Sequence, residues 1–383
     1  MKKRILFWVA FLAIDLAVVN AQNVSIPDAN FKAELVGNSS INTNGDTEIQ
    51  VSEAQAFSGA MDVSYKSIAD LTGIEAFVAI TELNCSGNSL TSLNVAANTA
   101  LQVLDCSTNQ LTAIDVSTNT ALKELYVKNN FNLASLDVST NTGLETLHCY
   151  NNDLSTLDVS TNTSLRRLYC FGNNLTTLDV SSNVALFSLH CNSNDLTTLN
   201  LAPGNSLGTL RCEWNELTAL DLSGTGVRSL SCQGNQLTSL NIQNGKNHFM
   251  NNNDFEAAYN PNLTCVQVDD VNYSSSNWMQ IDTGLTFSTN CTVTSINELP
   301  TLENLVLSPN PATSTVALSY RNGNAATIEN QGYEIELKVL DISGREFLSS
   351  NQPRLDVSGL PTGVYLVKIQ AGPQSLTKKL VVL

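Results

Sequence analysis

The chain has 383 residues, with 35 Asp and Glu against 19 Lys and Arg, so its formal net charge is −16. Nucleic acids and anionic lipid surfaces both require clustered positive charge, and this balance argues against either as the main partner. The length indicates about two or three domains. Asparagine occurs 46 times, which is unusual for an ordinary core-forming domain and favours a fold that stacks Asn-containing turns.

Residues 1–21 have the pattern of a secretory signal peptide, with a basic start at Lys2-Lys3-Arg4. An apolar run over 5–14 follows, and Val19-Asn20-Ala21 places small residues before Gln22. This pattern predicts export into an oxidising compartment. No later apolar run reaches the roughly 18 to 20 residues that span a bilayer, so we expect no transmembrane segment.

Residues 22–60 are predicted to form a short helical N-terminal cap. Helices are expected over 28–36 and 52–60, the second with Ser52 and Gln55 as a capping box. The segment between them, NTNGDTEIQVSE, resembles an EF-hand calcium loop, although Thr47 stands where that loop has Gly. An Asx-rich turn is the alternative to a structural calcium site. The candidate oxygen ligands are Asn42, Asn44, Asp46, Glu48, Gln50 and Glu53.

Residues 61–291 contain a tandem repeat of about 21 residues. The consensus is L-x-x-L-x-C-x-x-N-x-L-T-x-L-D-V-S-x-N-T-x, and its apolar positions can all face one interior. Strand-like alternation at positions 3 to 7 predicts one short parallel strand in each copy. The last copy fades after Lys246. The eight copies begin at Ile80, Leu101, Leu122, Leu144, Leu165, Leu186, Leu207 and Val227.

This pattern resembles the leucine-rich repeat, with Cys at its third apolar position. The resemblance implies a mainly β solenoid with parallel strands on a concave face. Because the repeats are too short for long helices, we expect extended or 3₁₀ segments on the convex face. Asn at position 9 is expected to bond turn backbone in all eight copies, and a second Asn ladder occupies position 19 in five of them. Asp at position 15 is interpreted as a local cap and not as a calcium ligand.

The nine cysteines divide into two groups. Seven occupy repeat position 6, where the third copy has Val127, so this position favours a small buried apolar group and predicts a ladder of free thiols. Cys265 and Cys291 lie outside the ladder and flank the end of the array, and we predict a disulfide between them. The pattern Leu263-x-x-Val266-x-Val268 is interpreted as one more strand of the repeat.

Residues 292–302 are predicted to be a linker, and 303–383 a small β-sandwich. Four blocks carry a specific resemblance: LSPNPA at 307–312, VLDISGR at 339–345, LPTGVYLV at 360–367 and KKLVV at 378–382. In this order they resemble the type A sorting domain of the type IX secretion system of Bacteroidota. The motif residues are Pro309, Asn310, Pro311, Asp341, Gly344, Arg345, Gly363, Tyr365 and Lys379.

The resemblance implies a route through the periplasm and recognition by the secretion machinery of the outer membrane. In that family the domain is typically cleaved, and the cargo is released or attached to the cell surface. The sequence therefore predicts a secreted or outer-surface protein whose partners include this machinery.

A recognition surface is expected where repeat positions 2, 3, 5, 7 and 8 point outward. Between Ile80 and Lys246, six of the seven Lys and Arg residues and six of the seven Phe, Tyr and Trp residues lie at these positions. Tyr, Trp and Arg are favoured in binding hot spots. The predicted contact residues are Tyr126, Lys128, His148, Tyr150, Arg167, Tyr169, Phe171, His190, Arg211 and Trp214.

These observations predict a binding protein that takes a protein ligand on its concave face. The first alternative is a glycan-binding module in which Tyr126, Tyr169, Phe171 and Trp214 stack on sugar rings. An exported hydrolase is the second. Consensus spacing places His148 and His190 two coils apart, about 10 Å, which is too far to share a metal or a proton. No nucleophile has a placed base, so we expect no catalytic residues and no cofactor apart from the structural calcium considered above.

Overall fold

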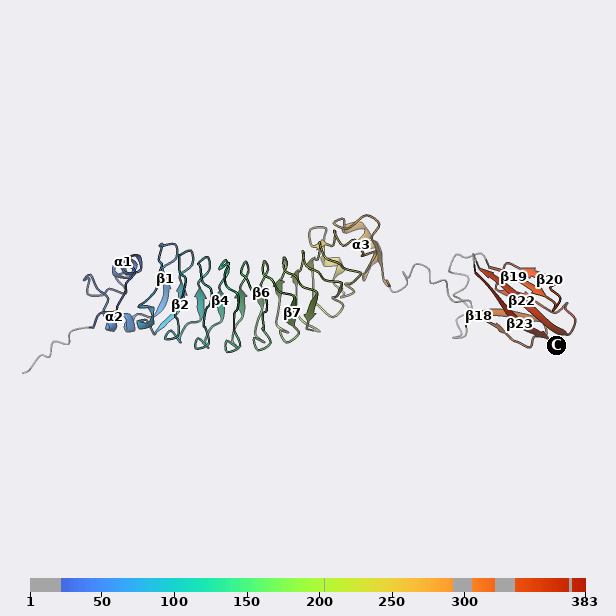
Figure 1. Cartoon of the computed structure of the whole chain (residues 1–383), viewed down its shortest axis with the longest axis horizontal. Helices are drawn as coiled ribbons and strands as arrows, with labels where there is room; N and C mark the ends of the chain where they lie inside the picture. Colours follow the sequence, from blue (N-terminus) through green and yellow to red (C-terminus); the bar gives the residue numbers. More distant parts are fainter. Residues whose placement is uncertain (1–21, 203, 292–304, 321–334, 372–373) are drawn as a thin grey trace, which may run out of the picture. The chain divides into compact units, whose positions relative to one another are not determined.

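The computed structural model describes residues 22–202, 204–291, 305–320, 335–371 and 374–383 (Figure 1). The chain separates into two compact units, one ending at Cys291 and the other beginning at Thr292. The predicted leader and the predicted linker lie outside the described residues. None of the helices in the described ranges has the length and hydropathy needed to cross a bilayer.

The first unit is a solenoid whose coils stack through a ten-stranded parallel sheet (Figure 1). This sheet lies where the sequence predicts the concave face, and we call its solvent side the sheet face. In sheet order its strands are β1 (Gly59–Asp62), β2 (Ile80–Asn84), β3 (Val103–Asp105), β4 (Glu124–Tyr126), β5 (Thr146–His148), β6 (Arg167–Tyr169), β8 (Ser188–His190), β10 (Thr209–Arg211), β12 (Ser229–Ser231) and β14 (Phe255–Glu256).

The opposite side of the coils is extended, as predicted. It carries two further parallel sheets at repeat positions 13 to 16, joined by turns. The first pairs β7 (Thr177–Val180) with β9 (Thr198–Leu201). The second has the order β11 (Ala219–Asp221), β13 (Ser239–Asn241), β15 (Cys265–Gln267) and β16 (Thr286–Ser288).

The repeat consensus builds the core between these layers. Leu104, Cys106 and Val116, at positions 4, 6 and 16 of one copy, are all completely buried, and their equivalents stack above and below them in one continuous cluster. All seven ladder cysteines are buried and free, as predicted. Burial raises the pKa of the Cys170 thiol to about 12, so the ladder consists of neutral, unreactive groups.

Two asparagine columns close turns of the solenoid, one at position 9 in all eight copies and one at position 19 in the first five. At position 9, Asn109 donates from Nδ2 to the carbonyls of Cys85 and Cys106, while its Oδ1 accepts from the N–H of Leu90. At position 19, buried Asn119 donates to the carbonyls of Val95 and Asn98 in the preceding coil. The Asp cap is also confirmed, since Asp115 Oδ1 accepts from the N–H of Ser117 at 2.9 Å. These bonds satisfy turn backbone that no neighbouring strand reaches.

The segment predicted as the N-terminal cap contains α1 (Ala29–Gly37) and α2 (Val51–Ala56). The 3₁₀ helix η1 (Ile74–Ala76) lies after it, between β1 and β2. The predicted extent of the second helix was wrong, because α2 ends at Ala56 and the chain turns directly into β1. The predicted capping box was also wrong. The box is formed by Gln50 and Glu53, and Glu53 Oε2 accepts from the N–H of Gln50 at 3.0 Å.

The C-terminal end of the solenoid corrects the interpretation of Leu263, Val266 and Val268. The next strand of the large sheet is β14, in which Phe255 pairs with Leu230, whereas β15 continues the opposite sheet. The repeat therefore persists beyond Lys246, and completely buried Asn260 supplies one more member of the position 9 column. An insertion with the 3₁₀ helix η2 (Asn247–Phe249) hides this coil from a fixed-period search.

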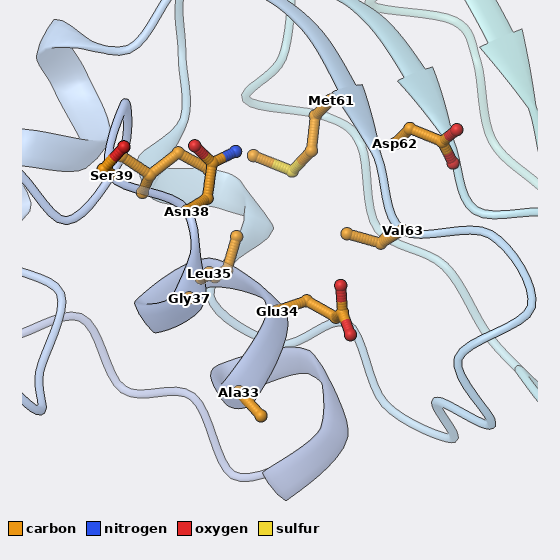
Figure 2. Close-up of a pocket in the computed structure, with 10 residues that line it drawn as sticks. Ala33, Glu34, Leu35, Gly37, Asn38, Ser39, Met61, Asp62 and Val63 are labelled. Atoms are coloured by element: carbon orange, nitrogen blue, oxygen red, sulfur yellow. The ribbon is translucent and has the colours of Figure 1, made fainter.

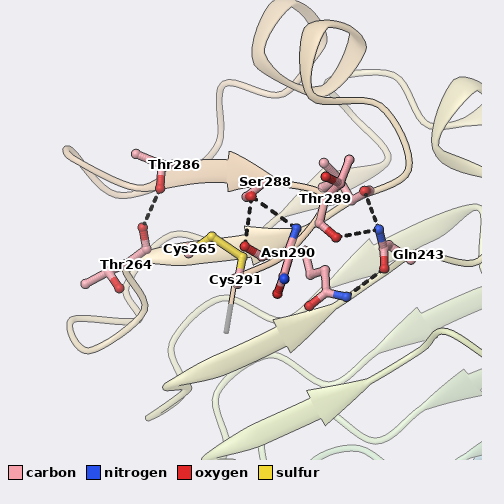
Figure 3. Close-up of a disulfide and its surroundings, with 10 residues drawn as sticks. Gln243, Thr264, Cys265, Thr286, Ser288, Thr289, Asn290 and Cys291 are labelled. Carbon is pink, nitrogen blue, oxygen red and sulfur yellow. Dashed lines mark hydrogen bonds between the residues drawn. A yellow bond between two sulfur atoms is a disulfide. The ribbon is translucent and has the colours of Figure 1, made fainter. Parts of the chain in front are cut away.

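The cap at this end includes α3 (Val271–Asn277) and the predicted disulfide. Cys265 in β15 is bonded to Cys291, with their Cα atoms 5.8 Å apart (Figure 3). Close by, Gln243 donates from Nε2 to the carbonyls of Val268 and Thr289, which ties the segment before Cys291 to the last coils. The disulfide closes this segment onto the solenoid, as the positions of the two cysteines predicted.

The second unit consists of two antiparallel sheets that share one core, as expected for a small β-sandwich. One sheet has the order β17 (Leu305–Ser308), β18 (Thr315–Tyr320) and β21 (Arg354–Asp356). The other has the order β20 (Glu346–Ser350), β19 (Ile335–Leu340), β22 (Gly363–Ala371) and β23 (Gln374–Val382).

Candidate ligand-binding surface

The register of the large sheet brings the predicted contact residues into columns. Tyr126, His148, Tyr169, His190 and Arg211 are partners on successive strands from β4 to β10. Each follows a buried Leu in its strand, and side chains alternate between the two sides of a sheet, so all five project from the sheet face. Position 5 of the repeat is therefore one continuous column on this surface.

The aromatic rings of this column stack on one another. Tyr169 lies between His148 and His190, with ring centroids 4.3 and 4.1 Å apart and the planes within 10° of parallel. Tyr126 meets the other side of His148 edge-on at 4.9 Å. Both faces of Tyr169 are consequently covered by neighbouring rings. The column presents ring edges and polar tips to solvent, and it leaves neither face of Tyr169 open to a sugar ring.

A second stack runs beside the first at position 7. The rings of Tyr150 and Phe171 lie 4.2 Å apart and nearly parallel, and Lys128 Nζ lies 5.5 Å from the centre of the Tyr150 ring. Contacts of this kind restrict ring rotation and add favourable energy beyond the area they bury. The middle of the sheet face is thus a preorganised aromatic surface.

Burial keeps the two histidines of the column neutral. It lowers the pKa of His148 to about 4, with a smaller contribution from the positive charges of Lys128 and Arg167. It likewise lowers the pKa of His190 to about 4, assisted by Arg211. The Tyr169 ring between them prevents direct contact between the two imidazoles. Among the described residues, no group of three or more His, Cys, Asp or Glu side chains is arranged to hold a metal ion.

Exposed aromatic rings mark the edge of the sheet face toward its C-terminal end. Trp214 is 52% exposed and Tyr259 is 65% exposed, and their ring centroids lie 5.9 Å apart. Both occupy repeat position 8, where the backbone has φ of 56° and 59°. The Trp214 ring covers Gly234 so closely that a Cβ there would come within 2.4 Å of it. Glycine at this position therefore makes room for the indole.

Charged side chains lie among these aromatic residues on the sheet face. Arg167 and Arg211 are exposed, and Arg211 Nη1 lies 3.9 Å from Glu213 Oε1. Burial raises the pKa of the Glu213 carboxyl. Glu256 of β14 accepts a hydrogen bond from Ser231 Oγ at 3.0 Å. The sheet face is therefore of mixed charge and not a basic patch.

Sequence reasoning missed Tyr259 and Glu256 because the insertion after Lys246 interrupts the period. The signal was present in the pair Tyr259-Asn260, which matches positions 8 and 9 of the repeat. Searching for the position 9 Asn alone, without a fixed period, would have found this coil.

The predicted calcium loop brings some of its candidate ligands together. Asn44 Nδ2 lies 3.0 Å from Asp46 Oδ2 and 2.6 Å from Gln50 Oε1, so these three side chains converge. Asn42 and Glu53 instead bond loop backbone, and Glu48 pairs with Lys32 at 2.7 Å. The calcium site stays a prediction, and the hydrogen bonds close this loop without an ion.

A cavity of about 450 Å³ lies where α1 and the segment after it meet β1 (Figure 2). Its lining includes Glu34, Asn38, Met61 and Asp62. The Glu34 carboxylate is already paired with Lys66 Nζ at 3.0 Å. We interpret this cavity as the joint between the cap and the first coil.

The sorting-motif residues organise the second unit. Asn310 donates from Nδ2 to the carbonyl of Lys379 and accepts from the N–H of Val381, which fastens the segment around Pro309 and Pro311 to β23. Other motif residues shape turns. Asp341 Oδ1 accepts from the N–H of Arg345 across a turn in which Gly344 has φ of 87°. Tyr365 donates from its hydroxyl to the carbonyl of Pro361 at 2.7 Å, beside Gly363 at the start of β22.

Comparisons with solved structures find similar chains at low sequence identity. The functional domain of InlJ from Listeria monocytogenes, which includes a cysteine ladder, is 21% identical, with 94% of this chain and 98% of that chain covered and a TM-score of 0.33. The leucine-rich-repeat domain of APL1B is 19% identical, with 55% and 65% covered and a TM-score of 0.44. Internalin C2 from L. monocytogenes is 14% identical, with 68% and 93% covered and a TM-score of 0.40. No curated protein sequence matches the chain.

A family model supplies the more specific finding. Residues 307–383 match the secretion system C-terminal sorting domain, the part of the chain in which all four sequence blocks lie. This domain directs proteins across the outer membrane to the surface or beyond, by the type IX route. Together with the parallel coils described above, the match identifies the chain as an exported leucine-rich-repeat solenoid protein with a C-terminal type IX sorting domain.

Proposed function

We propose that this exported protein is a non-enzymatic binding protein that captures a protein ligand through its sheet face. The observation that carries the proposal is the distribution of side chains. Repeat positions inside the coil are nearly uniform, whereas positions 3, 5, 7 and 8 of the sheet face hold stacked aromatic rings, exposed arginines and an exposed Trp. Residues of these kinds are enriched in the hot spots of protein interfaces.

Preorganisation supports a protein ligand over a sugar stacked on the central rings. Rings held between neighbours lose little conformational freedom on binding, so more of the contact energy contributes to affinity. Their exposed edges, the tyrosine hydroxyls and the guanidinium groups of Arg167 and Arg211 offer mixed apolar and polar contacts. A protein surface can match such a mixture over several coils.

The test measures binding of the chain from Gln22 to Leu383 to purified fibronectin, fibrinogen, laminin and mucin by surface plasmon resonance. For any protein bound, Arg167→Ala and Trp214→Ala are each expected to weaken affinity about tenfold or more, the usual effect of a hot-spot truncation. Phe131→Ala is the matched control, because its ring is 70% exposed but lies outside the outward strand positions. Binding that survives both sheet-face variants, or that is lost in the Phe131 control, would contradict the proposed surface.

A further inference from the structure

A groove of about 660 Å³ lies along the edge of the sheet face at which β8, β10 and β12 begin. Two exposed rings belong to its lining, Phe187 at 56% exposure and Phe249 at 62%. Phe187 and Gly208 both occupy repeat position 2 on adjacent coils, and Phe249 belongs to the inserted helix η2. The groove therefore exists only where the insertion after Lys246 rises beside the regular coils.

Glycine makes room for one ring of this groove. Gly208 occupies a position at which other coils carry Gln102, Lys123 or Arg166. A Cβ on Gly208 would lie 2.9 Å from the Phe187 ring, so this ring packs directly on Gly208 and a larger side chain there would displace it. The remaining lining is small and polar, and consists of Asn205, Ser206, Thr209, Gly226 and Ser229 together with Arg228 and Asp254.

The charged groups of the groove balance each other. The Arg228 guanidinium lies 5.1 Å from the centre of the Phe249 ring, and in the described part of the chain it forms no ion pair within 4.0 Å. Asp254 accepts a hydrogen bond from the N–H of Asn251 at 3.1 Å. One cation and one anion give no net charge, so the groove favours an uncharged ligand that both donates and accepts hydrogen bonds.

A neutral pyranose sugar has the properties that this lining requires. The C–H bonds of its ring carry partial positive charge and are attracted to the electron-rich face of an aromatic ring. Its hydroxyls both donate and accept, so they can bond a guanidinium, a carboxylate and the Ser, Thr and Asn groups of the floor. The volume lies within the range of about 300 to 1,000 Å³ that is usual for small-ligand sites.

We propose that this groove, formed by Phe187, Gly208, Arg228, Phe249 and Asp254, binds a neutral sugar unit of a glycan. The site is separate from the stacked rings of the proposed protein-binding surface. It differs from that surface in having two exposed rings, Phe187 and Phe249, that line a hollow, whereas the rings of the central columns are stacked on one another. The exported protein would therefore hold a glycan and a protein at different places on one sheet face.

The test titrates the chain from Gln22 to Leu383 with maltose, cellobiose, lactose and mannobiose by isothermal titration calorimetry. At least one of these disaccharides is expected to bind with a Kd between about 10 μM and 1 mM. Phe249→Ala removes one ring and Gly208→Val displaces the Phe187 ring, and each is expected to weaken binding about tenfold or more. Phe131→Ala, which removes an exposed ring outside the outward strand positions, serves as the control and is expected to retain it, while circular dichroism confirms the fold of every variant.

Two further probes distinguish a neutral sugar from the other possible occupants of the groove, an anionic sugar and a protein side chain. Digalacturonate tests an anionic sugar, and N-acetyl-phenylalanine amide tests a side chain of a protein partner. Binding of either probe in the absence of disaccharide binding would overturn the proposal, as would the absence of all binding. Disaccharide binding that survives both Phe249→Ala and Gly208→Val would place the sugar elsewhere and would also overturn it.

Discussion

At the scale of single residues, the solenoid depends on asparagine amides that substitute for missing backbone partners. Asn162 is completely buried and donates from Nδ2 to the carbonyls of Val138 and Asn141, at 3.0 and 2.9 Å. Only a side chain with a short donor can reach both carbonyls from this place. This requirement accounts for the recurrence of Asn at position 19, and for part of the high Asn content.

Changing Asn162 to Ala is expected to lower the free energy of unfolding by about 1 to 3 kcal/mol, because two hydrogen bonds in a buried turn are lost. Asn162→Asp keeps the shape but places an oxygen against carbonyl oxygens, and we expect a larger loss. Urea unfolding followed by circular dichroism measures both. Asn192→Ala is the control at a half-buried site, where Nδ2 has one contact of 3.5 Å, to Ser193 Oγ. Equal midpoints for all four proteins would refute the role of this column.

At the scale of elements, the strand register converts single aromatic residues into a stack. His190 is held neutral in this stack, since protonation would place a charge in a half-buried site beside Arg211. Its pKa of about 4 lies below the ordinary value of 6.5. The unfolded chain therefore binds more protons than the folded chain between these two values, and stability decreases as the pH falls through this window.

His190→Phe removes this titration while keeping a ring in the stack. Between pH 6.5 and pH 4, we expect the unfolding free energy of the variant to fall less than that of the wild type. Above pH 7, the difference in unfolding free energy between the two proteins should not change with pH. Tyr169→Phe retains both histidines and should keep the wild-type pH dependence. Thermal unfolding at half-unit pH intervals measures the three curves. A constant difference between His190→Phe and wild type across the range would count against a neutral, buried His190.

At the scale of the whole molecule, the two units have separate tasks, since one presents the sheet face and the other carries the export signal. Asn310 joins the sorting motif to the terminal strand by two hydrogen bonds, to Lys379 and Val381.

In a host with type IX machinery, deletion of residues 307–383 is expected to leave the protein in the periplasm. Asn310→Ala should reduce export in the same direction, whereas Asn351→Ala at an exposed bend should not. Immunoblots of periplasmic and surface fractions report the outcome, and normal export of the truncated chain would contradict it.

The sequence was sufficient for features that depend on regular repetition. The parallel coils, the buried thiol ladder and the Cys265–Cys291 bond follow from fixed spacing and from two cysteines left outside the pattern. It failed where the spacing changes, because Phe255 follows its partner Leu230 by 25 residues and not by about 21. The stacking of the rings could not be predicted from the repeat spacing either. Spacing places Tyr169 beside His190, but only side-chain torsions decide whether the two present faces or edges.

The disulfide also determines how the solenoid bears a mechanical load. If the exported protein is held through its C-terminal unit, tension enters the solenoid at Cys291 and passes through the bond to Cys265 in β15. The residues between them carry no force, so the cap cannot be peeled off by pulling. On the N-terminal side of this cap, each coil is joined to the next by a similar small set of strand and asparagine hydrogen bonds. Coils are then released one at a time, and each adds about 70 Å of extended chain, given about 3.4 Å per residue.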